Sequence, residues 1–123
     1  MVVVIQVARV VSGKTIWSPS LLLISTMIAT VLVLMAAHAL EVIVWASVYF
    51  LADAAPAGAG LVYFAFVNYT TLGYGDIIPV ERWQLLGPIT AMNGVLLFGW
   101  STAVIFEVLP QTLARGFFVG SLR

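Results

Sequence analysis

Residues 20–51 form an apolar stretch without proline or glycine, and its length constrains the fold of this chain more than any other feature. A helix that crosses the hydrocarbon core of a bilayer needs about 20 residues. Ser18 and Pro19 form a typical helix start, with serine as the N-cap and proline at the first helical position. We therefore predict a membrane-spanning outer helix over residues 19–51.

Aromatic residues stand near both ends of this predicted helix. Trp17 and Tyr49 would lie about 48 Å apart along a helix, slightly more than the roughly 40–45 Å of a bilayer with its headgroups. We expect these two side chains to lie at the two membrane interfaces, on a helix with some tilt.

The composition agrees with a membrane protein. Hydrophobic residues make up 63% of the chain and charged residues 8%, whereas a soluble domain has about a quarter charged residues. The net charge is zero and no basic cluster occurs, which argues against nucleic-acid binding. With one histidine and no cysteine the chain cannot build a zinc site, and it has no nucleotide-binding fingerprint. We expect neither an enzyme nor a bound cofactor.

Residues 80–109 are predicted to form a second, inner helix. Their most apolar part, residues 85–109, is again long enough to cross a bilayer. Pro110 is expected to end this helix, because proline lacks the N–H group that a helix interior needs. Pro88 is expected to kink the helix near its outer end.

A shorter apolar segment lies between the two predicted spans. Residues 61–70 would measure about 15 Å as a helix, half of a hydrocarbon core of about 30 Å. A half-length apolar segment between two full spans is typical of a re-entrant helix. We predict such a helix over residues 60–70, in an all-α membrane protein.

The distribution of charge predicts the topology. Basic residues precede the first span and follow the second, whereas the segment between them carries three acidic residues and one basic residue. By the positive-inside rule we expect both termini in the cytoplasm of a chain that crosses the plasma membrane twice. Residues 1–18 are then a cytoplasmic or interfacial segment, and residues 111–123 a cytoplasmic tail.

The string TTLGYGD, residues 70–76, follows the predicted re-entrant helix. Backbone inside a bilayer must be helical, buried in protein or in contact with water. Gly73, Tyr74 and Gly75 do not fit an ordinary helix, so we expect them to line an aqueous path. Because glycine tolerates positive φ, the alternation of glycine with other residues lets successive carbonyl groups turn to one side.

This string resembles the selectivity filter of potassium channels, with Leu72 at the position of valine in TVGYG. The chain is similar to the small two-span potassium channel pores of bacteria over roughly residues 20–109. Pro79 and Trp83 also stand where that family often has proline and an aromatic residue.

The resemblance implies a homotetramer in the lipid bilayer with a potassium channel pore domain over residues 19–110. Its filter would be residues 71–75, and potassium would be the transported ion rather than a cofactor. The ion would be bound by rings formed from the carbonyl oxygens of Thr71, Leu72, Gly73 and Tyr74 and the Thr71 hydroxyl. The Leu72 and Tyr74 side chains are expected to point away from the axis and pack behind the filter.

Charges near the filter are expected to favour cations. The C-terminal end of the re-entrant helix, or pore helix, carries roughly half a negative elementary charge. Asp76 and Glu81 would add carboxylates at the outer mouth. We therefore predict passive movement of potassium through the pore.

Departures from the family leave alternatives open. Many relatives have threonine at the position of Asn68, and a tryptophan pair at Tyr63 and Phe64. These residues normally brace the filter, so a weakly selective cation channel is one alternative. A non-conducting membrane subunit of a larger channel assembly is another.

Polar residues on the outer helix are candidates for filter support. His38 and Glu41 are separated by three positions and share a helix face. A charged group at mid-membrane costs about 2.5–3.5 kcal/mol, which favours a functional interpretation. We predict that the pair contacts the back of the pore helix, and we favour a structural clamp over a pH sensor. The candidate partners are Tyr63, Asn68, Tyr69 and Asn93. Asn68 and Thr70 complete the predicted filter support.

A stripe on the inner helix is the last candidate region. The stripe contains Asn93, Leu96, Leu97 and Trp100, which recur at helical spacing. Gly94 and Gly99 lie beside it, and they fit either a hinge, as inner-helix glycines provide in this family, or close helix packing.

Overall fold

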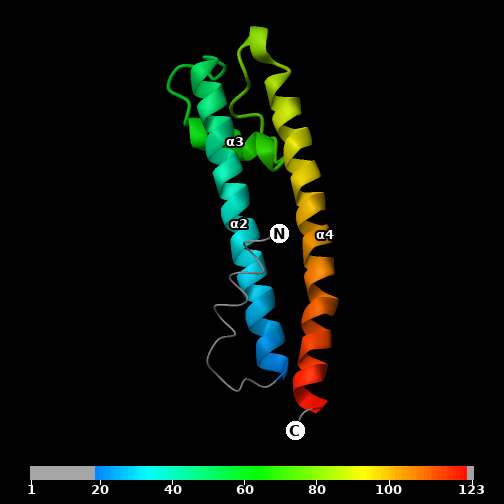
Figure 1. Ribbon diagram of the computed structural model, residues 1–123. Helices are drawn as coiled ribbons and strands as arrows, with labels where there is room; N and C mark the ends of the chain where they lie inside the picture. Colours follow the sequence, from blue (N-terminus) through cyan, green and yellow to red (C-terminus); the bar gives the residue numbers. More distant parts are fainter. Residues whose placement is uncertain (1–18, 122–123) are drawn as a thin grey trace. The chain divides into compact units, whose positions relative to one another are not determined.

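The computed structural model describes the backbone of residues 19–121 and the side chains of residues 20–114. These residues form helices and connecting segments, with no strand among them. The predictions for residues 1–18, including Trp17, lie outside the described part of the chain. In chain order the elements are α2 (Pro19–Leu51), α3 (Leu61–Tyr69), the short 3₁₀ helix η1 (Glu81–Trp83) and α4 (Leu86–Ser121) (Figure 1).

Helix α2 has the bounds predicted for the outer helix, and its C-terminus shows why it ends there. The N–H of Ala54 donates to the carbonyl of Tyr49 at 3.0 Å, and the N–H of Asp53 donates to Phe50 at 3.2 Å. Asp53 has φ of 51°, the left-handed conformation that follows many helix ends. Aspartate is one of the residues that tolerate this conformation.

Helix α4 differs from the predicted inner helix at both ends. It begins at Leu86, so Pro88 lies in the first turn. Because an N–H group in the first turn has no intrahelical partner, proline breaks no helical hydrogen bond there. The predicted kink at Pro88 is therefore wrong. Pro110 lies inside the helix and does not end it, so the predicted boundary at residue 109 is also wrong. Proline is tolerated inside membrane helices, where other groups can satisfy the freed carbonyl.

The described chain falls into two compact units, one of which covers residues 37–100. In this unit α3, green in Figure 1, packs against the parts of α2 and α4 that belong to it. The buried core residues are Val42, Ala46, Tyr49, Ala54, Phe64, Ala65 and Tyr69. Tyr49 is fully buried and its hydroxyl lies 2.7 Å from Thr90 Oγ1, so its side chain packs inside the protein. Its predicted place at a membrane interface stays a prediction.

The other unit combines α2 up to Ala36 with α4 from Ser101 onward. Its buried hydroxyl groups are satisfied within their own helices: Thr30 donates to the Thr26 carbonyl and Thr112 to the Val108 carbonyl, each at 2.8 Å. Among the described residues, two helical segments are long and apolar enough to cross a membrane, Ser20–Leu51 and Glu81–Ala114.

Candidate functional site

The candidate filter begins where α3 ends, and the helix terminus fixes its start. The N–H of Leu72 donates to the Val67 carbonyl and the N–H of Thr71 to the Asn68 carbonyl, each at 3.0 Å. These two bonds, with Thr71 at φ of 59°, form the Schellman motif that terminates many helices. Positive φ is rare for a β-branched residue such as threonine. The chain therefore enters the candidate filter through a strained residue.

Backbone conformations alternate along the candidate filter. Thr71, Gly73 and Gly75 have φ of 59°, 56° and 77°, whereas Leu72 and Tyr74 between them do not have positive φ. Alternation of this kind turns successive carbonyl groups toward the same side of the strand. Within the described chain, no hydrogen bond ends on the carbonyl oxygens of residues 72–75. These oxygens therefore accept no backbone hydrogen bond from the described residues, as the prediction of a carbonyl-lined filter requires.

The Thr71 hydroxyl is oriented by its neighbour. It donates its proton to the Thr70 carbonyl at 2.6 Å. Its oxygen lone pairs are then directed away from that bond, and a hydroxyl oxygen offers two of them. Thr71 can therefore supply an oxygen ligand below the carbonyl row.

Side chains of the candidate filter lack cover from their own chain. The exposed fractions are 51% for Leu72 and 69% for Tyr74, so the predicted packing behind the filter does not occur within a single chain. Irregular backbone at membrane depth must be buried in protein or face water. Any cover for these side chains must therefore come from outside the described residues.

Asp76 is held at the outer mouth by the pore helix. The Tyr63 hydroxyl donates to Asp76 Oδ2 at 2.7 Å. This hydrogen bond, with smaller effects of burial and of the Asp76 charge, raises the pKa of Tyr63 above its ordinary value of 10.0. Tyr63, one of the candidate partners of the His38 and Glu41 pair, thus contacts Asp76, which is predicted to lie at the outer mouth.

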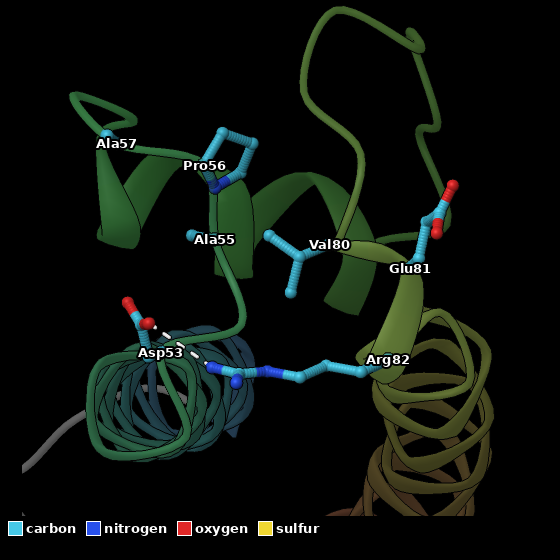
Figure 2. A pocket seen from close by; sticks show the side chains of 7 residues that line it. All are labelled: Asp53, Ala55, Pro56, Ala57, Val80, Glu81 and Arg82. Atoms are coloured by element: carbon cyan, nitrogen blue, oxygen red, sulfur yellow. Dashed lines mark hydrogen bonds and ion pairs between the residues drawn. The ribbon is translucent and has the colours of Figure 1, made fainter.

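Glu81 lies beside a second outer feature, an open pocket between the turn after α2 and η1 (Figure 2). Arg82 Nη2 spans this pocket to Asp53 Oδ2 at 3.2 Å, and both side chains are largely exposed. The N–H of Val80 also donates to the Ala54 carbonyl at 3.0 Å. The residues that line the pocket are Asp53, Ala55, Pro56, Ala57, Val80, Glu81 and Arg82. These contacts tie the segment after the filter to the end of α2.

His38 contacts the end of the pore helix. Its Nδ1 lies 2.7 Å from the Tyr69 hydroxyl, and its ring centroid lies 4.5 Å from that of Phe98. Tyr69 is one of the four candidate partners that the sequence predicted. The functional role predicted for the pair stays a prediction.

The other predicted support residues bond within the pore helix. Asn68 Nδ2 donates to the Phe64 carbonyl at 3.0 Å, and Thr70 Oγ1 donates to the Phe66 carbonyl at 2.8 Å. Both bonds reach back one helical turn, so they stabilise the last turns of α3 before the candidate filter. Phe64 itself is buried in the core.

The predicted stripe on α4 divides between two environments. Asn93 and Leu97 face the core: Asn93 Oδ1 accepts a hydrogen bond from Trp45 Nε1 at 3.0 Å, and Leu97 packs against the buried cluster. Leu96 and Trp100 are 67% and 72% exposed. Gly99 is exposed as well. The cavity role predicted for the stripe stays a prediction.

Sequence reasoning did not single out Trp45 or Thr90. Both take part in bonds between α2 and α4, the first with Asn93 and the second with Tyr49. A signal was present for Trp45, because residues 38, 45 and 49 follow one another at helical spacing and all are ring-bearing residues with a polar group.

A family model described as an ion channel matches residues 37–111, more than half of the chain. The chain belongs to this ion channel family. The match covers the whole of the unit that contains the candidate filter. The predicted class, an all-α membrane channel with two spans, is confirmed. No curated protein and no solved structure gave a significant match to the channel.

Proposed function

We propose that this channel conducts potassium selectively and passively through residues 71–75. The observation that carries the proposal is the alternating φ of Thr71, Gly73 and Gly75, next to carbonyl oxygens that accept no hydrogen bond in the described chain. Such oxygens can replace the hydration shell of a potassium ion. No cofactor is needed, because the ion moves down its own gradient.

One chain supplies one row of oxygens, so several copies must surround the ion. A closed ring of identical chains requires cyclic symmetry, and filters of this chemistry use four loops. The exposed Leu72 and Tyr74 side chains support assembly, because neighbouring copies would cover them. We therefore propose a homotetramer in the plasma membrane, with both termini in the cytoplasm.

The surroundings of the filter favour a cation. Helix α3 ends at Tyr69, and its C-terminus carries a partial negative charge of roughly half an elementary charge. Asp76 and Glu81 add carboxylates on the outer side. Four copies of each would raise the local concentration of cations at both ends of the filter.

The test is rubidium uptake into lipid vesicles that contain only this protein. Gly75→Ala and Gly58→Ala form a matched pair, because the two glycines have φ of 77° and 81° and neither has a heavy atom within contact distance of an added Cβ. Both variants carry the same strain of roughly 1–2 kcal/mol. We expect wild type and Gly58→Ala to take up rubidium and Gly75→Ala to lose uptake.

The same assay separates the alternatives. Absence of uptake by a folded wild-type protein contradicts conduction and favours a subunit of a larger assembly. Uptake of sodium as fast as rubidium contradicts selectivity and favours a weakly selective cation channel. Equal loss of uptake in Gly58→Ala and Gly75→Ala would contradict the assignment of the filter.

A further inference from the structure

Tyr69 connects the candidate filter to both long helices. It is the last residue of α3, two positions before Thr71, and its side chain is 1% exposed. Its ring contacts one aromatic neighbour from each of the other two helices, with centroid distances of 5.9 Å to His38 and 5.6 Å to Phe98. A shift of α2 or α4 would therefore reach Tyr69, two positions before the filter segment.

The backbone of Tyr69 lies against α4 at Gly94. A Cβ added to Gly94 would collide with the Tyr69 carbonyl oxygen, and it would also meet the carbonyl carbon at 3.0 Å and the ring at 3.4 Å. The obstacle is backbone, so no side-chain rotation relieves it. Gly94 is thus required for close packing of α4 on the end of the pore helix, one of the two roles that the sequence left open.

The side chain of Tyr69 is fixed to α2 through its hydroxyl. His38 Nδ1 lies 2.7 Å from this oxygen. Neutral imidazole can accept the hydroxyl proton at Nδ1, and protonated imidazole can donate to the hydroxyl oxygen. The contact can therefore exist in both protonation states of His38, as a structural clamp requires.

We propose that Tyr69 is a positioning residue that sets ion selectivity. Its carbonyl group packs against Gly94, and its hydroxyl is hydrogen-bonded to His38. This inference rests on the proposed function of the filter. Tyr69 touches no ion. It holds the end of α3, and hence the start of the carbonyl row, at a fixed distance from α2 and α4.

The first test compares Gly94→Ala with Gly99→Ala. Both changes add one methyl group to α4, but an added Cβ at Gly99 has no atom within 4 Å. We expect Gly94→Ala to lower the rubidium-to-sodium uptake ratio by roughly tenfold or more, because filters select by the placement of their oxygens. Gly99→Ala should keep the wild-type ratio. Equal ratios in both variants would overturn the role of Gly94.

The second test removes the hydroxyl contact alone. Tyr69→Phe keeps the buried ring, and we expect it to lower the uptake ratio by roughly two- to tenfold, the range of one hydrogen bond. His38→Leu should lower it similarly, and the double variant should be no worse than either single variant. Additive effects, or an unchanged ratio in Tyr69→Phe, would overturn the clamp.

The outcomes distinguish this inference from the proposed function. If wild type takes up no rubidium, the proposed function fails, and the oligomeric state of Gly94→Ala then shows only whether the packing contact supports assembly. If wild type is selective and all variants match it, the channel function stands and the positioning role of Tyr69 is overturned. Electrophoresis in each assay shows whether the variant forms the tetramer. Where a variant fails to assemble, the conclusion is drawn from Tyr69→Phe, which preserves the packing.

Discussion

At the residue scale, Thr71 is the most constrained position of the channel. A β-branched residue with φ of 59° costs of order 1–3 kcal/mol and persists where its surroundings require it. Two backbone hydrogen bonds close the helix end around it, and its hydroxyl donates to the Thr70 carbonyl. The strain lies where the pore helix becomes the candidate filter, so we attribute it to the orientation of the first oxygen ligands.

The hydroxyl of Thr71 can be tested with isosteric changes. Thr71→Val keeps the branched shape but loses the oxygen, and we expect rubidium uptake to fall by roughly tenfold, because a hydrogen bond of about 1–1.5 kcal/mol is lost together with a ligand. Thr71→Ser keeps the hydroxyl and relieves the crowding, so its uptake should stay near that of wild type. Wild-type uptake by Thr71→Val would contradict the assigned role.

Tyr63 should titrate at unusually high pH. Its pKa is raised, chiefly by the hydrogen bond to Asp76. The folded protein therefore favours the protonated form of Tyr63. The resulting stabilisation of the folded state is present below about pH 10 and is lost as the pH rises through the raised pKa of Tyr63. The difference in tyrosinate absorbance between wild type and Tyr63→Phe measures this transition. Titration of Tyr63 at or below the ordinary tyrosine pKa would disprove the bond.

At the scale of the elements, α2 and α4 are joined by polar contacts within a largely apolar packing. Trp45 donates to Asn93, and the Tyr49 hydroxyl lies 2.7 Å from Thr90 Oγ1. Lipid tails give apolar surfaces no strong preference for one another, so hydrogen bonds and close packing contribute much of the specificity of helix association. These contacts fix the register of the two helices around α3.

The contact between Tyr49 and Thr90 should contribute to stability. We expect Tyr49→Phe to destabilise the folded channel by about 0.5–1.5 kcal/mol, measured as loss of the tetramer on heating in detergent. Ser47→Ala is the control, because the exposed Ser47 hydroxyl bonds only to the Ile43 carbonyl of its own helix. An equal effect of the two variants would show that the contact between α2 and α4 contributes nothing specific.

Pro110 offers a test of the extent of α4. Because the helix runs through this proline, Pro110→Ala should leave the helix content unchanged in circular dichroism and should raise thermal stability by restoring a backbone hydrogen bond. A marked gain of helix content in the variant would mean that proline ends the helix after all.

These cases show which features the sequence could predict. Length and apolarity were sufficient for α2 and α3, because a bilayer allows few alternatives to helices. They were insufficient at Pro88 and Pro110, since a proline is harmless in a first turn and tolerated within a membrane helix. The burial of Tyr49 against α4 was not predicted, because it depends on the fold and is not visible in residue type.

At the scale of the whole molecule, a single chain is an incomplete pore. The candidate site could be located from the sequence because glycine alternation has a direct backbone consequence, seen in the φ of Gly73 and Gly75. The contact between the Tyr69 carbonyl and Gly94 could not be predicted, because it depends on how closely α3 and α4 approach each other. Nor does the sequence give the stimulus that opens the channel. The account depends on copies of the chain placing their carbonyl oxygens around one axis.

The most direct test of this claim is the reversal potential of the purified channel in a planar bilayer, with potassium on one side and sodium at equal concentration on the other. The account predicts a large potential that opposes potassium flow, retained in Gly58→Ala and lost in Gly75→Ala. A reversal potential near zero for the wild-type channel would contradict it.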